Sequence, residues 1–414
     1  MKKAFGLLTI IMLLTMALAA CGPAGAELTC PEGDTCVEVG ADEPIRVGWM
    51  MVVSGGDASL GTDTKRGVEI AIDDKGELLG HQIELVGEDE LCNAEGGQTA
   101  ATKLAADPKL AAIVGSNCSS AARAAIPIVC GANIPMISPS NTAPDLTDAA
   151  RPAEYWCYMR TAHNDLVQGA AMADYAYGEG FRNAATVHDG SIYADQLQQV
   201  FAARFQELGG TIVAQEAVGP DDTDMKPMLT RVAAAGPDFI YYPIFIKAGG
   251  QITKQAREVA GLEEVQLAGA DGIFSPDFLS AAGDAVMGFN WSSPDFSAFG
   301  AGYGDFLTKH ETKYGEKTLA PFHAHAYDAA NVVFAAIEKV AVQGEDGSML
   351  IPRKALHAAM AATANFSGLT GNLTCGETGD CADPKIAVYE CVNSDPASWN
   401  PGAVEGSNPI KIWP

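Results

Sequence analysis

Residues 110–142 read LAAIVGSNCSSAARAAIPIVCGANIPMISPSNT, and this pattern sets the architecture predicted for the whole chain. Residues 110–114 form a short apolar run, which is typical of a buried parallel strand. A polar turn with serine hydroxyls follows, and the alanine-rich residues 121–130 predict a helix. Residues 134–137 predict a second strand that opens into another polar loop. Two strand ends thus place hydroxyls and free backbone N–H groups together, one set at a helix N-terminus, where a small carboxylate binds well.

Strands and helices alternate through most of the chain. Strands are predicted at residues 45–50 and 81–86, with helices at 62–74 and 97–106. A second series has strands at 155–160, 184–187, 211–218, 238–242 and 265–269 with helices between them, and Asp224 is the expected N-cap of the helix over 225–234. The alternation predicts an α/β fold with two doubly wound parallel-sheet lobes.

Helices without intervening strands follow at residues 303–314, 325–339 and 352–364, and residues 369–392 return as strands. These helices must cover a sheet built elsewhere, most simply the sheet of the first lobe. A chain that passes between two lobes more than once forms a hinge of several parallel segments.

The composition is that of a globular protein, with 414 residues of which 48% are hydrophobic and 19% charged. The formal net charge of −26 argues against nucleic acid or an anionic membrane surface as the main partner.

The N-terminus has the features of an export signal. Lys2 and Lys3 precede an apolar run over residues 5–18, and Leu18-Ala19-Ala20-Cys21 resembles a bacterial lipobox. We expect residues 1–21 to be a lipoprotein signal peptide that ends at a lipidated Cys21, and residues 22–43 to be a tether with one stapled turn. An ordinary secretory signal with a chance cysteine is the alternative. No later stretch has the apolar length of a membrane-spanning helix.

Nine cysteines besides Cys21 would then lie in an oxidising compartment, which favours disulfides. Two pairs each bracket a short turn-rich loop: Cys30 with Cys36, and Cys375 with Cys381. Cys92 and Cys118 each follow a predicted strand at the same edge of the sheet, so they could pair. Cys130, Cys157 and Cys391 cannot all be paired together. Zinc is the alternative, but no pair has the two-residue spacing of a zinc knuckle, and we expect no metal.

Several segments together resemble the type I periplasmic solute-binding proteins of the branched-chain amino acid (leucine/isoleucine/valine) class. They occur in the family's order over roughly residues 44–392. The matching segments are Cys118-Ser119-Ser120, Ile137-Ser138-Pro139-Ser140-Asn141-Thr142, Met159-Arg160-Thr161 with Gln168-Gly169, His188-Asp189 with Tyr193, Asp238-Phe239-Ile240-Tyr241-Tyr242, Lys254-Gln255-Ala256-Arg257 and Tyr327-Asp328-Ala329.

The resemblance implies two lobes that are joined by three crossovers and close on a ligand. The crossovers are expected near Thr161, Trp291 and Phe366. Lobe 1 would comprise residues 44–162 with 293–365, and lobe 2 residues 163–292 with 366–414.

The resemblance also implies roles for particular residues. Ser119 would hold the ligand carboxylate through its hydroxyl and N–H, and Thr142 would contact carboxylate and ammonium, with the Ser140 carbonyl on the ammonium. Asp271 would pair with the ligand's amino group, and Tyr193 would close over the ligand from lobe 2. The family also pairs cysteines at the positions of Cys92 and Cys118. The predicted ligand site further includes Leu60, Asn117, Cys118, Asn141 and Phe245.

The chain departs from the family at three of these positions. Leu60 stands where the leucine-binding members have an aromatic side chain, and Asp271 is one methylene shorter than their glutamate. Asn117 replaces an apolar residue, and a polar wall there argues against a purely aliphatic ligand.

The expected function is that of a lipid-anchored, extracytoplasmic substrate-binding protein of an ABC importer. It would capture an amino acid, branched-chain or more polar, or a related small carboxylate, and deliver it to the permease. We expect a monomer with no cofactor and no enzymatic activity. A ligand-sensing receptor domain for amides, urea or aromatic acids, acting through a separate partner, is the alternative.

Two further alternatives have less support. A hydrolase triad could be written from Ser119, His188 and Asp189, but the chain has no Gly-x-Ser-x-Gly motif. His323 and His325 could begin a metal site, but their side chains diverge in the predicted helix.

Overall fold

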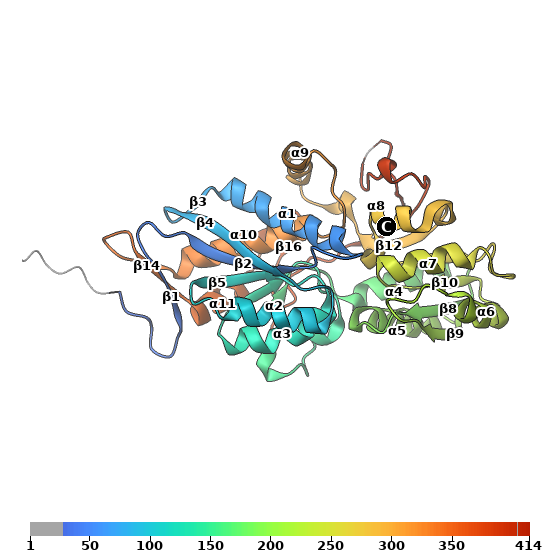
Figure 1. The fold of residues 1–414 in the computed structure, drawn as a ribbon, viewed down its shortest axis with the longest axis horizontal. Helices are drawn as coiled ribbons and strands as arrows, with labels where there is room; N and C mark the ends of the chain where they lie inside the picture. Colours follow the sequence, from blue (N-terminus) through green and yellow to red (C-terminus); the bar gives the residue numbers. More distant parts are fainter. Residues whose placement is uncertain (1–27, 404) are drawn as a thin grey trace, which may run out of the picture.

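The computed structural model describes residues 28–403 and 405–414. The predicted signal peptide, Cys21 and the first residues of the predicted tether lie outside these described residues. Two lobes, each built on its own sheet, lie side by side along the long axis of the molecule (Figure 1). This is the predicted two-lobed α/β architecture.

Lobe 1 is built on a six-stranded sheet with the order β3-β4-β2-β5-β6-β7. All neighbouring pairs are parallel except β3 with β4. Every residue of β5 is buried, as its apolar sequence predicts. The strands are β2 (Ile45–Met51), β3 (Glu77–Leu78), β4 (His81–Asp89), β5 (Leu110–Gly115), β6 (Met136–Ser138) and β7 (Tyr158–Arg160).

The sheet of lobe 1 separates two hydrophobic cores. One face packs against α1 (Ala58–Lys75), α10 (His323–Val340) and α11 (Arg353–Ala361), and the other against α2 (Ala94–Ala105) and α3 (Ser119–Gly131). Helix α9 (Tyr303–Tyr314) lies beside α1 (Figure 1). The prediction that the late helices cover the first lobe is confirmed for α10 and α11.

Lobe 2 is built on a seven-stranded sheet with the order β18-β17-β12-β11-β10-β8-β9. The strands from β8 to β12 run parallel, whereas β17 and β18 are antiparallel additions at one edge. The strands are β8 (Asn183–His188), β9 (Thr211–Ala217), β10 (Phe239–Tyr241), β11 (Gln266–Gly269), β12 (Asn290–Pro294), β17 (Ile386–Glu390) and β18 (Ile410–Trp413). The helices are α4 (Asp165–Gly178), α5 (Ile192–Glu207), α6 (Lys226–Ala235), α7 (Ile246–Ala256) and α8 (Pro276–Ala282).

Both sheets reverse their strand order at one point. Counted along the chain, the parallel strands of each lobe follow the order 2-1-3-4-5, so neighbouring strands leave in opposite directions at β2/β5 and at β8/β10. The loops that follow such strands diverge and leave a crevice at the carboxyl edge of the sheet, where ligands of α/β proteins bind.

Helices α1, α2, α3 and α10 begin earlier than their sequence patterns indicate, at Ala58, Ala94, Ser119 and His323. The N-cap of α6 is Met225 rather than Asp224, although the Asp224 carboxylate accepts a hydrogen bond from the Lys226 N–H at 3.2 Å.

The predicted tether is shorter than expected. Strand β1 (Cys36–Val39) pairs antiparallel with β14 (Met349–Pro352), which also pairs with β13 (Val342–Gln343). Val37 and Val39 are buried in the core of lobe 1. Residues 36–39 therefore belong to the folded lobe, which alternation in so short a segment did not reveal.

The third crossover also lies later than predicted. Phe366 begins a hairpin of β15 (Phe366–Ser367) and β16 (Asn372–Leu373), and both Leu373 and Cys381 pack in the core of lobe 1. The chain enters the sheet of lobe 2 only at Ile386. We therefore place the crossovers at residues 161–163, 294–299 and 382–385, which line one small hinge cavity.

Four disulfides are present in the described chain. The three predicted pairs form, namely Cys30–Cys36, Cys92–Cys118 and Cys375–Cys381, and Cys130 pairs with Cys157. Cys391 is buried without a disulfide partner among the described residues. Among those residues, no helix combines the length and apolarity that a membrane crossing requires.

We predict that Arg160 holds the hinge together. Its guanidinium is fully buried and donates to the carbonyls of Asn141 and Ala143, to Thr147 Oγ1 and to the Asp380 carboxylate. Arg160→Met should lower the free energy of unfolding by about 3–5 kcal/mol, because it leaves a charge and several buried acceptors unpaired. Urea unfolding followed by circular dichroism measures the loss.

Arg204→Met is the matched control, since Arg204 forms a half-exposed pair with Asp174. It should cost less than about 1 kcal/mol. Equal losses in the two variants would contradict the structural role of Arg160.

Candidate functional site

A cavity between the lobes gathers polar side chains from strand ends of both sheets. It is small, about 20 Å³, which is little more than one water molecule needs. The lining residues are Leu60, Asn117, Cys118, Ser119, Ser140, Thr142, Tyr193, Phe245, Asp271, Gly272 and Phe322.

The wall from lobe 1 is the N-terminus of α3. Ser119 is the first residue of this 13-residue helix, and its N-cap, Cys118, offers no side-chain cap. The first N–H groups of the helix therefore remain available to an anion, with the helix dipole in their favour. The Ser119 hydroxyl accepts a long hydrogen bond, 3.3 Å, from the Ala143 N–H and so ties this helix to the loop of Thr142.

Asn117 lines the cavity but has its polar groups engaged within lobe 1. Its side-chain amide donates to Thr64 Oγ1 at 2.9 Å, and its oxygen accepts from the Val52 N–H at 3.2 Å. Because these polar groups are engaged within lobe 1, Asn117 does not argue against an aliphatic ligand.

The wall from lobe 2 is a buried carboxylate. Asp271 is 2% exposed; its Oδ1 accepts from the Tyr193 hydroxyl at 2.5 Å, and its Oδ2 has no hydrogen-bond partner among the described residues. Burial raises the pKa of Asp271. Gly272 allows this arrangement, since a Cβ there would lie 2.8 Å from the Ile244 carbonyl oxygen.

A second polar layer lies behind Asp271. His163 Nε2 lies 3.5 Å from Asp271 Oδ2 and 2.6 Å from Gln168 Oε1. Asp165 is fully buried, and neither of its carboxylate oxygens has a partner in the part of the chain described. Its pKa is raised well above the usual value by burial and by the nearby Asp271. This layer places two further buried titratable groups, His163 and Asp165, under the floor of the cavity.

The remaining walls are apolar or aromatic. Tyr193 and Phe245 pack with ring centroids 5.4 Å apart, and Phe322 stacks on His163 at 5.9 Å. Leu60 completes this side from lobe 1. The cavity thus combines a polar end with a hydrophobic end.

The structure brings together every predicted site residue except Asn141. Asn141 is buried and turns away from the cavity, and its side-chain oxygen accepts from Ser116 Oγ and the Tyr158 hydroxyl. Cys118 contributes to the wall while bonded to Cys92.

Sequence reasoning missed Gly272 and Phe322 as lining residues. Gly272 follows Asp271 directly and could have been included with it. Phe322 precedes a helix of lobe 1 and carries no local signal for a site.

Side chains of lobe 1 hydrogen-bond to helix N-termini of lobe 2 across the cleft. Asp57 Oδ1 accepts from the Ile246 N–H at the start of α7, at 3.1 Å. Ser120 Oγ accepts from the Ile192 N–H at the start of α5, at 3.2 Å. Such caps form only when the lobes are closed.

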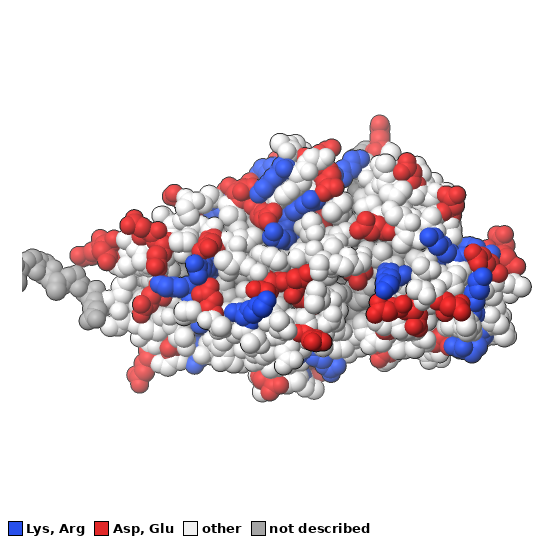
Figure 2. All heavy atoms as spheres, viewed as in Figure 1, with Lys and Arg blue, Asp and Glu red and all other residues white. Residues whose placement is uncertain are grey.

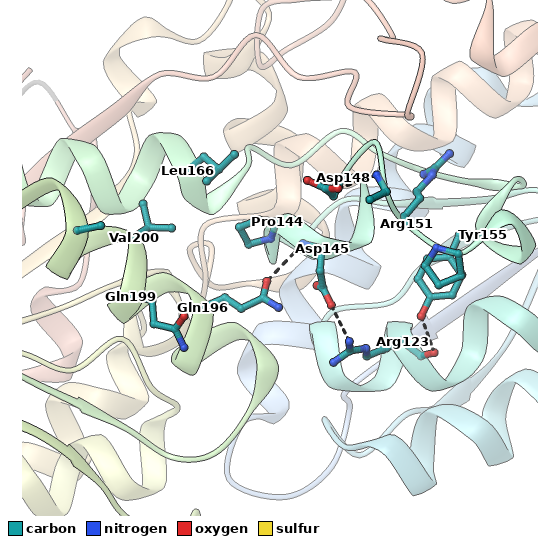
Figure 3. A pocket seen from close by; sticks show the side chains of 13 residues that line it. Arg123, Pro144, Asp145, Asp148, Arg151, Tyr155, Leu166, Gln196, Gln199 and Val200 are labelled. Atoms are coloured by element: carbon teal, nitrogen blue, oxygen red, sulfur yellow. Dashed lines mark hydrogen bonds and ion pairs between the residues drawn. The ribbon is translucent and has the colours of Figure 1, made fainter.

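A larger groove runs along the outer seam between the lobes. It has a volume of about 680 Å³ and lies between α3 with residues 144–155 on one side and α4 with α5 on the other (Figure 3). Two pairs of its polar groups are already formed: Arg123 with the Asp145 carboxylate, and the Gln196 side-chain oxygen with the Asp145 N–H. We therefore take the inner cavity as the candidate site.

Three other sequence candidates, His188, Asp189 and His323, have structural partners. His188 and Asp189 accept hydrogen bonds from the N–H groups of the turn that follows them, rather than forming a triad with Ser119. His323 lies between the Asp63 carboxylate and the Tyr303 hydroxyl, both at 2.8 Å. On the face shown in Figure 2, basic side chains are interspersed with acidic ones and form no continuous basic surface.

Comparisons with known proteins agree with this geometry. A family model described as periplasmic binding protein matches residues 44–395. The Leu/Ile/Val-binding protein BraC3 of Rhizobium johnstonii is 26% identical over 84% of this chain and 92% of its own length. The crystal structure of the leucine binding protein LivK from Thermotoga maritima has a TM-score of 0.75 and 26% identity, covering 84% of this chain and 96% of its own.

A solute binding protein of an ABC transporter from R. palustris, solved with benzoate, has the same fold with a TM-score of 0.72. It is 22% identical and covers 89% of this chain and 96% of its own. The chain belongs to the periplasmic binding protein family, in the type I class of the Leu/Ile/Val-binding proteins.

Proposed function

We propose that the protein captures an α-amino acid or a related small carboxylate outside the cytoplasm and delivers it to the permease of an ABC importer. It would act as a monomer by binding and closure, without a cofactor, a reaction or a nucleic-acid partner. The relatives matched over most of the chain are named as binding proteins.

One observation carries this proposal: one wall of the cavity favours a negatively charged group of the ligand, and the other wall favours a positively charged group. The N-terminus of α3 with Ser119 and Thr142 favours a carboxylate, and on the other side Asp271 Oδ2 has no hydrogen-bond partner within residues 28–403 and 405–414. A buried unpaired carboxylate costs several kcal/mol, which a ligand ammonium would remove. An α-amino acid satisfies both walls at once.

The apolar end of the cavity supports an apolar ligand side chain. Leu60, Phe245 and Phe322 offer no charged group, and the Asn117 amide is engaged within lobe 1. Relatives named for leucine, isoleucine and valine make a branched-chain amino acid the first ligand to test.

The second candidate is a sensor for aromatic acids, amides or urea that acts through a separate partner. The benzoate complex of a protein with this fold favours it, since benzoate has no amino group. An aromatic acid would use Ser119 and Thr142 through its carboxylate but has no ammonium to pair with Asp271, whereas the N–H groups of an amide or urea could donate to Asp271.

Closure is the proposed mechanism of capture. The ligand would bind to α3 in the open form, and the caps from Asp57 and Ser120 would form as lobe 2 closes over it. The ligand shifts the population toward the closed form because only that form satisfies both of its charges.

We predict that Asp271→Asn selectively weakens amino acid binding. Removing one partner of a buried charge pair should raise the Kd for L-leucine or another bound amino acid by about 30-fold or more. Isothermal titration calorimetry, after a thermal-shift screen of amino acids, amides and aromatic acids, measures the change.

Asp224→Asn is the matched control, because Asp224 is exposed in lobe 2 outside the cavity. It should leave the Kd unchanged within about twofold. If aromatic acids bind and Asp271→Asn leaves every affinity unchanged, the second candidate replaces the first.

We further predict a pH effect from Asp57. Burial raises the pKa of Asp57 to about 6, with Asp189 and Asp277 adding to the shift and Lys247 and the Ile246 N–H opposing it. Because Asp57 has a higher pKa in the closed form than in the open form, its protonation stabilises the closed form. This stabilisation is lost as the pH rises through about 6. Asp57→Asn keeps an oxygen for the Ile246 N–H but does not titrate.

The ratio of the wild-type Kd to the Asp57→Asn Kd should fall by about tenfold from pH 8 to pH 5. Taking the ratio of the two Kd values removes the effects of titration of the ligand and of other acidic groups, which are the same in both proteins. Asp305→Asn, a change of an exposed acid on α9, is the control. A ratio independent of pH would show that Asp57 does not change its environment on closure.

Lipid anchoring through Cys21 is also part of the proposal, and it rests on the lipobox-like sequence. Cys21→Ser should move the protein from the membrane fraction to the soluble extracytoplasmic fraction and abolish labelling with radioactive palmitate. Retention of both properties in the variant would mean that the lipid is attached elsewhere, whereas a wild type that is itself unlabelled and outside the membrane fraction would support the ordinary secretory signal.

A further inference from the structure

Glu90 lies directly behind the loop that presents Ser119. It follows β4 at the carboxyl edge of the lobe 1 sheet and is fully buried. Its Oε1 accepts from two consecutive backbone N–H groups, those of Asn117 at 3.1 Å and Cys118 at 2.8 Å. Its Oε2 is buried and has no partner among the described residues.

These contacts fix the segment that begins α3. Asn117 and Cys118 are the two residues before Ser119, so their peptide planes set where the first N–H groups of the helix point. The Cys92–Cys118 disulfide ties the same segment to the chain two residues beyond Glu90. Glu90 supplies the polar part of this attachment.

The charge state of Glu90 matters because of where it lies. An ionised carboxylate here would put a second negative charge next to the proposed site of the ligand carboxylate. No Lys, Arg or His of the described chain donates a hydrogen bond to it. Of the neighbouring acids, Asp89 adds repulsion, whereas Glu95 on α2 is exposed.

We propose that Glu90 is a positioning residue. As a neutral acid it holds the Asn117–Cys118 segment in place and thereby makes carboxylate binding at Ser119 possible. The proposal extends the function above and rests on it for the identity of the ligand. Burial raises the pKa of Glu90 to about 8, against the lowering by the N–H groups of Cys118 and Asn117 and by Ser116.

The first test needs no ligand. Amide hydrogen exchange, followed by NMR, should show the protection of Asn117 and Cys118 falling at least about tenfold in Glu90→Ala. Glu90→Gln should keep it within about threefold, because its amide oxygen still accepts both bonds. Equal protection in all three proteins would overturn the positioning role.

The second test addresses the neutral form. The pKa of Glu90 is higher in the folded protein than in the unfolded chain. The wild type therefore loses stability as the pH rises from about 4.5 to 8. The difference in Tm between Glu90→Gln and wild type should therefore grow across that interval. A constant difference would mean that Glu90 is ionised in the folded protein and would overturn the proposal.

The third test measures binding, with L-leucine and benzoate as probes. From pH 7 to pH 9 the wild-type Kd should rise about tenfold relative to that of Glu90→Gln, as the neutral fraction falls. Glu88→Gln is the control: it removes the same charge two residues earlier, in β4, but at a surface pair with Lys103. If neither probe binds, the proposed ligand class fails, while exchange and Tm still decide the role of Glu90.

Discussion

The rest of the structure depends on the strand order of the two sheets. In each lobe the order 2-1-3-4-5 makes neighbouring connections diverge, and the crevice opens at the carboxyl ends of the strands. The segments that follow β2, β5 and β6 supply Leu60, Ser119 and Thr142. The segments that follow β8, β10 and β11 supply Tyr193, Phe245 and Asp271. Because both crevices line the same cavity, side chains that are distant in the sequence face each other across it. No local sequence pattern indicates that they meet.

This arrangement gathers carboxylates where water is scarce. Asp271, Asp165 and Glu90 are buried, and burial raises the pKa of each. In such a site closure without a cation carries a desolvation cost, and the caps across the cleft offset only part of it. A ligand with its own positive charge changes this balance, so binding and closure become one equilibrium rather than two independent steps.

The sequence predicted the architecture because buried parallel strands and polar strand ends are local features. Residues 110–115 and the serines after them identified the lobe 1 wall, and the family resemblance supplied Tyr193 and Asp271 from lobe 2. Prediction from the sequence failed where the position of a residue depends on contacts with segments far along the chain. Val37 and Val39 are buried only because β14 pairs with β1, and Phe366 stays with lobe 1 through a hairpin and the Arg160–Asp380 pair. Phe322 reaches the cavity only because α10 packs against the lobe 1 sheet.

The hinge and the ligand wall share one residue. Arg160 donates to the carbonyls of Asn141 and Ala143, which flank Thr142, and pairs with Asp380 beside the third crossover. Asn141 turns away from the cavity and accepts from Ser116 and Tyr158, so it joins this support rather than the ligand. The loop of Thr142 is therefore fixed to lobe 1 and to two hinge segments at once. In the proposed mechanism, a rigid wall on that side means that closure would move Tyr193 and Asp271 toward a carboxylate site that is already formed, which would reduce the ordering cost of binding.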